Sequence, residues 1–185
     1  MGALELGLLA AMCWGFHDVC VRFISQKTPI SACIFIVLIV GLIFHICLMM
    51  PSKEISTITK AAFTYASIAG VSFVIASFSL YYAFKRGPVK LVAPLIASYP
   101  ILSITWAIWI GTPVSKLQIL AVLAIILGVS IVAIMSDNSE EEIPPIGKTI
   151  ALSIVAAIAF ACTFALGQAA AELSPHMSAT LVTRI

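Results

Sequence analysis

Six long apolar segments dominate this sequence, and each is about as long as the 20 residues that an α-helix needs to cross a lipid bilayer. They are Leu4–Phe23, Ile30–Met50, Ala62–Phe84, Leu91–Ile110, Leu117–Met135 and Thr149–Leu166. In hydrocarbon the backbone must satisfy its own hydrogen bonds, as a helix does, and the segments lack the alternation of membrane strands. The sequence therefore predicts an all-α fold, a polytopic bundle of membrane helices.

The composition also indicates that lipid is the solvent of this chain. Hydrophobic residues make up 62% of the 185 positions and charged residues 10%, whereas soluble domains have about 45–50% and about 25%. The net charge of +2 and the absence of a basic cluster argue against a nucleic-acid partner. We expect a multi-pass protein of a cell membrane, with the bacterial inner membrane as the leading candidate, whose first partner is the lipid bilayer.

The residues after an acidic, proline-containing linker, 136–148, match the first segment at a constant spacing of 146 positions (156 − 10 = 146). The matched pairs are Ala10 with Ala156, Ala11 with Ala157, Trp14 with Phe160, Thr28 with Ser174 and Pro29 with Pro175. Internal repeats are a common construction of secondary transporters. We therefore expect residues 1–135 to form a first five-helix repeat and residues 149–185 to begin a second. Because five is odd, the second would be inverted in the membrane.

Three stretches of the sequence carry a resemblance to a known family. They are "LLAAMCWGF" in the first segment, "YYAFKRGPVKLVAPLIASYPIL" across the third and fourth, and "KLQILAVLAIILGVSIV" in the fifth. Together they resemble the EamA-type transporters of the drug/metabolite transporter superfamily. The chain departs from the family pattern at Thr112, where an acidic residue is common, and at Ala121, where glycine is usual. The resemblance implies a parent of ten helices, two inverted repeats around a central cavity, and hence a second repeat that is truncated in these 185 residues.

The first segment carries ionisable residues that are costly in hydrocarbon. Trp14, Asp18 and Arg22 follow one another at four-residue spacing, so they form one stripe on a helix, with His17 beside it. A charge at the bilayer centre costs about 2.5–3.5 kcal/mol on insertion scales, which pairing of Asp18 with Arg22 can offset. One interpretation is that the stripe faces a wet cavity and binds or gates a polar substrate, with His17 or Asp18 carrying a proton. The alternative is that Arg22 snorkels from the helix end and Asp18 is its structural partner.

The fourth segment contains two prolines that predict a bent or locally opened helix. Pro94 and Pro100 each remove a backbone hydrogen bond, and the freed carbonyls need a polar neighbour inside a membrane. We expect Ser98 or Tyr99 to point toward the Trp14 stripe, so that this break contributes to a translocation site. The alternative is a packing kink in which the hydroxyls bond back to their own helix.

Two further tyrosines and the missing motifs complete the functional prediction. Tyr81 and Tyr82 are candidates either as substrate contacts or as aromatics at the membrane interface. The sequence has no Walker or dinucleotide motif, so transport would use a gradient of protons or another ion. The histidines are scattered, so we expect no metal, and nothing in the sequence suggests a cofactor. A clustered catalytic set is also missing, so we expect no enzyme activity.

The expected function is secondary transport, by alternating access, of small polar metabolites or drug-like compounds, with export as the expected direction. A membrane scaffold or regulatory protein without transport is the alternative, and an intramembrane enzyme is a more distant one. A homodimer is compatible with the sequence. The orientation stays open, because the positive-inside rule favours an outside N-terminus and the family resemblance implies an inside one.

Overall fold

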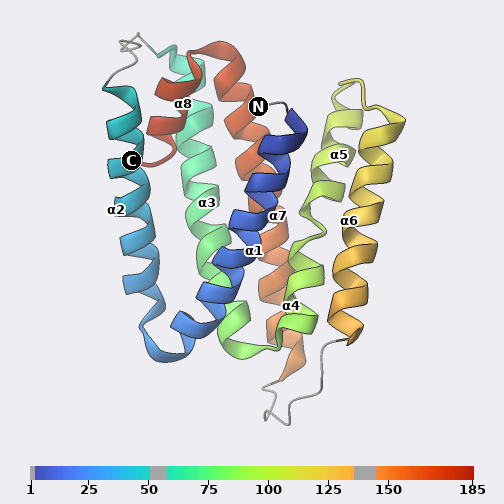
Figure 1. Ribbon diagram of the computed structural model, residues 1–185. Coiled ribbons are helices and arrows are strands. Elements are labelled where there is room, and N and C mark those ends of the chain that lie inside the picture. The colour runs from blue at the N-terminus through green and yellow to red at the C-terminus, as the bar shows by residue number, and fades with distance from the viewer. Residues whose placement is uncertain (1–2, 51–57, 136–144) are drawn as a thin grey trace.

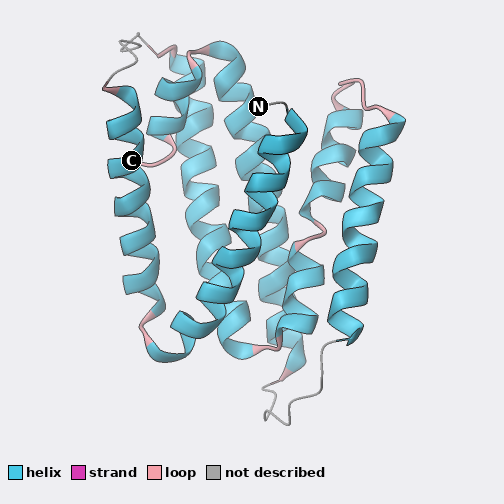
Figure 2. Ribbon diagram, viewed as in Figure 1, coloured by secondary structure: helices cyan, strands magenta, loops and turns pink. Residues whose placement is uncertain are grey.

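The computed structural model describes residues 3–50, 58–135 and 145–185, and all regular elements in these ranges are α-helices (Figures 1 and 2). They are α1 (Ala3–Lys27), α2 (Ile30–Met49), α3 (Lys60–Arg86), α4 (Val89–Ile96), α5 (Tyr99–Trp109), α6 (Lys116–Met135), α7 (Ile146–Leu173) and α8 (His176–Val182). Five spans are long and apolar enough to cross a membrane, namely α1, α2, α3, the pair α4–α5 and α7, and α6 is apolar over Lys116–Ile131. The predicted helical membrane bundle is confirmed.

The spans run up and down the bundle in alternation, with α4 and α5 running in the same direction as one interrupted span (Figure 1). α1 descends in that view from the N-terminus, and α7 ascends from the opposite end, so these two helices are antiparallel. Helix α7 begins at Ile146, after Pro145, three residues before the start that the apolar pattern predicts. The acidic part of the predicted linker, 136–144, lies outside the described residues.

The centre of the bundle is the close pairing of α3 with α7. The buried side chains along these two helices are mostly alanines, among them Ala66, Ala76 and Ala156, each with no exposed surface. Such small residues allow helix backbones to approach closely in a membrane. Gly87, in the turn after α3, lies so near Thr149 of α7 that a Cβ at position 87 would collide with the Thr149 Cγ2 atom. The surface of α3 and the turn after it are therefore shaped to receive α7.

The fourth predicted segment is interrupted, as its prolines predict. Helix α4 ends at Ile96 and α5 begins at Tyr99, and the interruption is visible as a loop in Figure 2. Pro100 has no N–H to donate to the Ile96 carbonyl, four residues back, which explains why the helix opens here. Pro94, by contrast, lies inside α4 without ending it.

Candidate functional site

A layer of aromatic rings lies among the helices, near the middle of α1, α3 and α7. Phe160 of α7 is 3% exposed, and its ring centroid lies 5.8 Å from that of Trp14 on α1 and 6.3 Å from that of Phe73 on α3. Tyr99 of α5 adds a fourth ring, with its centroid 6.3 Å from that of Phe160. The Trp14 and Phe73 rings meet Phe160 edge to face, the arrangement that aromatic quadrupoles favour. We call Trp14, Phe73, Phe160 and Tyr99 the aromatic layer.

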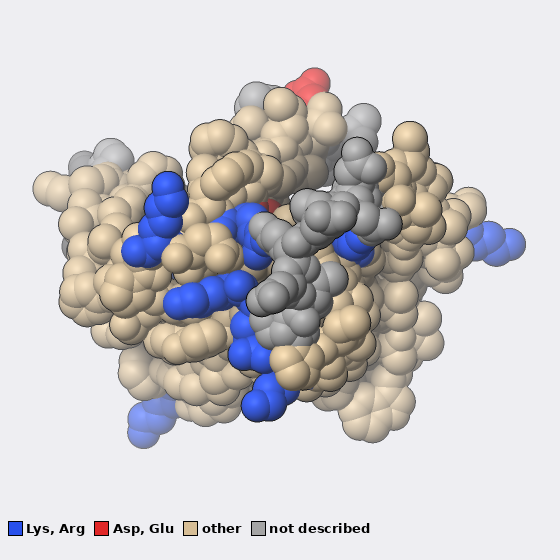
Figure 3. All heavy atoms as spheres, turned by 90° about the horizontal axis from the view of Figure 1, so that it is seen from below, with Lys and Arg blue, Asp and Glu red and all other residues tan. Residues whose placement is uncertain are grey.

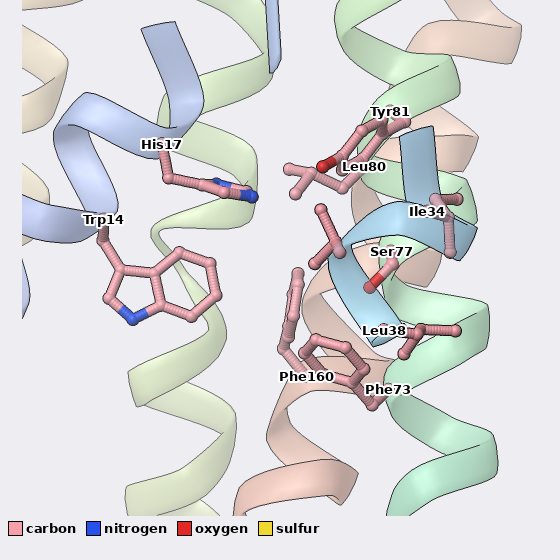
Figure 4. A pocket seen from close by; sticks show the side chains of 10 residues that line it. Trp14, His17, Ile34, Leu38, Phe73, Ser77, Leu80, Tyr81 and Phe160 are labelled. Atoms are coloured by element: carbon pink, nitrogen blue, oxygen red, sulfur yellow. The ribbon is translucent and has the colours of Figure 1, made fainter. Parts of the chain in front are cut away.

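A small cavity adjoins the aromatic layer on the side of the α1–α2 and α3–α4 turns (Figure 4). Its volume is about 20 Å³, enough for about one water molecule. His17 and Trp14 enter it from α1, while Ser77 and Tyr81 enter it from α3. The complete lining is Trp14, His17, Ile34, Val37, Leu38, Phe73, Ser77, Leu80, Tyr81 and Phe160.

A larger cavity adjoins the same layer on the side of the α7–α8 turn. Its volume is about 260 Å³, and it shares Trp14 and Phe73 with the small cavity. The complete lining is Trp14, Phe73, Thr163, Phe164, Gly167, Gln168, Ala179, Thr180, Thr183 and Arg184. The volume approaches the lower end of the range, about 300 Å³, of pockets that hold drug-sized ligands.

The two cavities are lined by residues that stand in register along the sequence. Five residues of α1 and α2 line the small cavity, and each has a counterpart 146 positions later in the sequence (17 + 146 = 163). Four of the counterparts line the larger cavity, and the fifth, Phe160, belongs to the aromatic layer. The pairs are Trp14 with Phe160, His17 with Thr163, Ile34 with Thr180, Val37 with Thr183 and Leu38 with Arg184. The spacing is the one at which the sequence of α1 and its following turn matches that of α7. The paired residues differ in chemistry, since Arg184 of the larger cavity is the counterpart of Leu38 of the small cavity.

The ionisable residues of α1 divide between the small cavity and the end of α3. His17 Nδ1 lies 3.1 Å from Asp18 Oδ1, and the His17 ring meets that of Tyr81 at 6.1 Å between centroids. The Asp18 side chain is 35% exposed and is not part of either cavity lining. Arg22 Nη1 donates to the Phe84 carbonyl at 2.5 Å and to the Gly87 carbonyl at 3.3 Å. Arg22 therefore caps the C-terminal end of α3, where helix carbonyls lack partners of their own.

The remaining predicted site residues are only partly brought together. Tyr81 is buried in the small cavity, whereas Tyr82 is 45% exposed and lines neither cavity. The Ser98 hydroxyl donates to the Leu95 carbonyl at 2.6 Å, within its own segment, as the packing-kink alternative predicts. Phe160 lies between Tyr99 and Trp14, with ring contacts to both, and Pro100 occupies the first turn of α5.

Apart from Trp14, sequence reasoning missed the residues of the larger cavity. Thr163, Thr180 and Arg184 come from α7, α8 and the residues just after α8, which carry no local motif. The repeat spacing was the available signal, since it maps His17 onto Thr163 and Trp14 onto Phe160. The repeat spacing did not predict a role for Arg184, because its counterpart Leu38 is an ordinary apolar residue. Among the described residues, no three His, Cys, Asp or Glu side chains are grouped as metal ligands.

Comparison with known proteins places the chain in a family. A stretch of 133 residues, 71% of this chain, is 30% identical to an uncharacterized protein of Methanocaldococcus jannaschii and covers 96% of that protein. No solved structure matches the chain. The EamA-like transporter family matches residues 1–134, which include the first six helices and nearly all of the small cavity. The chain therefore belongs to the EamA-like transporter family, as the three sequence stretches indicated.

Proposed function

We propose that this protein is a secondary transporter that moves small polar metabolites or drug-like compounds by alternating access through the two cavities. Family membership supports transport in general. The specific mechanism is supported by one observation. Residues 146 positions apart line two cavities of unequal volume, about 20 and about 260 Å³, on opposite sides of one aromatic layer.

Alternating access between two inverted repeats requires that, in any one state, the cavity of one repeat is larger than that of the other, as these two volumes are. If residues 1–135 are one repeat and residues from 149 onward begin its inverted copy, equivalent positions face opposite sides of the membrane. The antiparallel course of α1 and α7 supports this division, with 136–148 as the linker (Figure 1). One cavity is then open and its counterpart closed. Exchange of the two conformations would move the opening to the other side.

The aromatic layer has the position expected of a barrier between the two openings. Trp14 and Phe73 border both cavities, so movement of their rings would change both volumes at once. His17, bonded to Asp18 beside the small cavity, is the group we assign to proton coupling, because imidazole side chains serve as proton shuttles in proteins. Export is the direction that we expect.

Flux measurements on the complete gene product test this proposal. Proteoliposomes with an imposed proton gradient are loaded with a panel of labelled metabolites, and efflux is followed with and without the gradient. We expect saturable efflux of at least one small polar compound, which the gradient accelerates. A protein that is folded and monodisperse but gives no saturable flux for any compound in either direction would favour the scaffold or regulatory alternative.

A further inference from the structure

Arg184 is an unusual residue for a membrane bundle, because it is charged and half-buried, and it lies beside glycines of α2 and α3. Its guanidinium carbon lies 5.0 Å from the centre of the Phe73 ring in α3. A Cβ built at Gly41 of α2 would stand 3.5 Å from Arg184 Nη1, and one built at Gly70 of α3 would stand 2.9 Å from the Thr183 carbonyl oxygen. The Gly41 distance is an ordinary contact, whereas the Gly70 distance is too short, so the position of this segment against α3 depends on Gly70.

The charge of Arg184 has no acidic partner among the described residues. Of the described carboxylates, Asp18 is bonded to His17 on the far side of the aromatic layer, and Glu172 accepts a hydrogen bond of 3.0 Å from Gln168. The contact of Arg184 with Phe73 is a cation–π contact, which offsets part of the cost of a half-buried charge. An ionisable side chain at a cavity of a membrane bundle, with no acidic partner among the described residues, is a candidate site for a ligand or ion.

The other walls of the larger cavity limit what such a ligand can be. The Thr163, Thr180 and Thr183 hydroxyls donate to the carbonyls of Ala159, His176 and Thr180 at 2.8, 2.7 and 2.6 Å. Their hydrogens are thus engaged by the backbone, and their oxygens face ligands as acceptors. Trp14, Phe73 and Phe164 supply aromatic surface. The cavity therefore offers one cation, the Gln168 amide, a few hydrogen-bond acceptors and apolar walls.

We propose that the larger cavity binds a small organic carboxylate with an apolar body, and that the Arg184 guanidinium pairs with the carboxylate. The planar guanidinium presents parallel N–H donors that match the two carboxylate oxygens, which a neutral amide or an amine on the ligand could not use in this way. The apolar body lies against the aromatic walls. The volume of about 260 Å³ limits the ligand to a molecule smaller than a typical drug. That this ligand is also the transported substrate rests on the proposed function.

Binding of a matched set of probes tests the assignment without any transport. Radiolabelled benzoate is bound to the complete protein in nanodiscs, and unlabelled benzamide and benzylamine, which are neutral and cationic analogues of similar size, compete with it. Benzoate should bind saturably, and both analogues should compete at least about tenfold more weakly, because one lost charged hydrogen-bond pair has at least this effect. Equal competition by the three probes, or preference for benzylamine, would overturn the proposal.

Substitutions then locate the binding site. Arg184→Gln should weaken benzoate binding about tenfold or more, whereas Arg184→Lys, which keeps the charge but loses the planar fork, should weaken it less. Lys116→Gln, which removes the same charge at the start of α6 outside both cavities, should leave benzoate affinity unchanged. Unchanged benzoate affinity in a folded Arg184→Gln protein contradicts the proposal.

The outcomes separate this inference from the proposed function. Arg184-dependent benzoate binding without flux of any compound would leave the carboxylate site in place and reject transport. Saturable flux, combined with benzoate binding that is unchanged in Arg184→Gln, would support transport and reject the carboxylate site.

Discussion

At the scale of single residues, Phe160 joins the two parts of the chain. Its ring contacts Trp14 of α1, Phe73 of α3 and Tyr99 of α5, and it is almost completely buried. It also stands at the position that the repeat spacing pairs with Trp14, so two equivalent residues meet in the middle of the bundle. A barrier that depends on one ring should fail when that ring is removed.

Replacing Phe160 with alanine should therefore both destabilise the protein and open a leak between the cavities. Truncation of a buried phenylalanine costs about 3–5 kcal/mol. Thermal unfolding in detergent and passive efflux from proteoliposomes measure the two effects. Ile158→Ala is the matched control, because Ile158 is on the same helix, is 50% exposed and lines neither cavity, so its loss should have a much smaller effect. Equal behaviour of the two variants would mean that Phe160 is not the barrier.

Arg22 allows the two interpretations of the α1 stripe to be separated. Its guanidinium donates to the Phe84 and Gly87 carbonyls at the end of α3, which supports a structural role. We expect Arg22→Gln to lower the free energy of unfolding by about 1–3 kcal/mol, since carbonyls lose their charged donor. Substrate affinity should stay within about twofold. Lys27→Gln, at an exposed position one turn on, serves as the control. A large change in affinity with normal stability would restore Arg22 as a binding residue.

At the scale of helices, the packing of α3 on α7 depends on a few close contacts at the ends as well as on alanines along the middle. The turn after α3 touches α7 at Gly87 and Thr149, and both Thr149 and the neighbouring Ser153 are fully buried. At the other end, the Thr59 N–H at the start of α3 donates to the Ser174 hydroxyl in the α7–α8 turn at 3.1 Å. These contacts fix the position of α7 along the axis of α3.

The contact at Gly87 can be tested by a rescue experiment. Its backbone is extended, with φ −131°, so any residue can adopt it and a defect must come from collision. Gly87→Ala should destabilise the bundle by about 1–3 kcal/mol, the usual cost of overpacking. Adding Thr149→Ser removes the Cγ2 atom that the new methyl group would contact, and should restore much of the lost stability. If the double variant unfolds at the same temperature as Gly87→Ala alone, the collision is not the cause.

Most of the helices could be predicted from the sequence because hydrocarbon makes length and apolarity sufficient criteria. The break between α4 and α5 was also predictable, since it follows from the covalent structure of Pro100. The direction of the Ser98 hydroxyl was not, because bonding to Leu95 competes with bonding across helices, and local patterns do not decide between them. Arg184 was equally hidden, since Phe73 and Gly41 lie more than a hundred positions away in the sequence.

At the scale of the whole molecule, charge is distributed unequally between the two ends of the bundle. Basic residues gather at the end seen in Figure 3, which holds the last turns of α1 and α3 and the first turns of α4 and α7. The residues are Lys27, Lys85, Arg86, Lys90 and Lys148. Among the described residues, Lys60 and Lys116 stand at the other end. The family resemblance and this charge distribution favour opposite orientations.

The charge distribution predicts that the basic end faces the cytoplasm, since positive loops are retained inside. Single cysteines at Lys148 and Thr112, both exposed and at opposite ends, report the orientation in a cysteine-free background. An impermeant maleimide applied to intact cells should label Thr112→Cys and spare Lys148→Cys, and inside-out vesicles should reverse the pattern. Labelling of Lys148→Cys from outside would show that the orientation implied by the family resemblance holds.

The central claim is that the two cavities open in turn, and the reactivity of one cysteine in each tests it most directly. Ser77 lines the small cavity and Thr163 the larger one, and both tolerate cysteine because its size is similar. In the complete, cysteine-free protein without a gradient, Thr163→Cys should react quickly with a water-soluble maleimide and Ser77→Cys slowly. Conditions that drive transport, or a lipid environment that favours the other state, should raise the Ser77→Cys rate and lower the Thr163→Cys rate together. Rates that rise and fall in parallel, or that never change, would contradict alternating access through these two cavities.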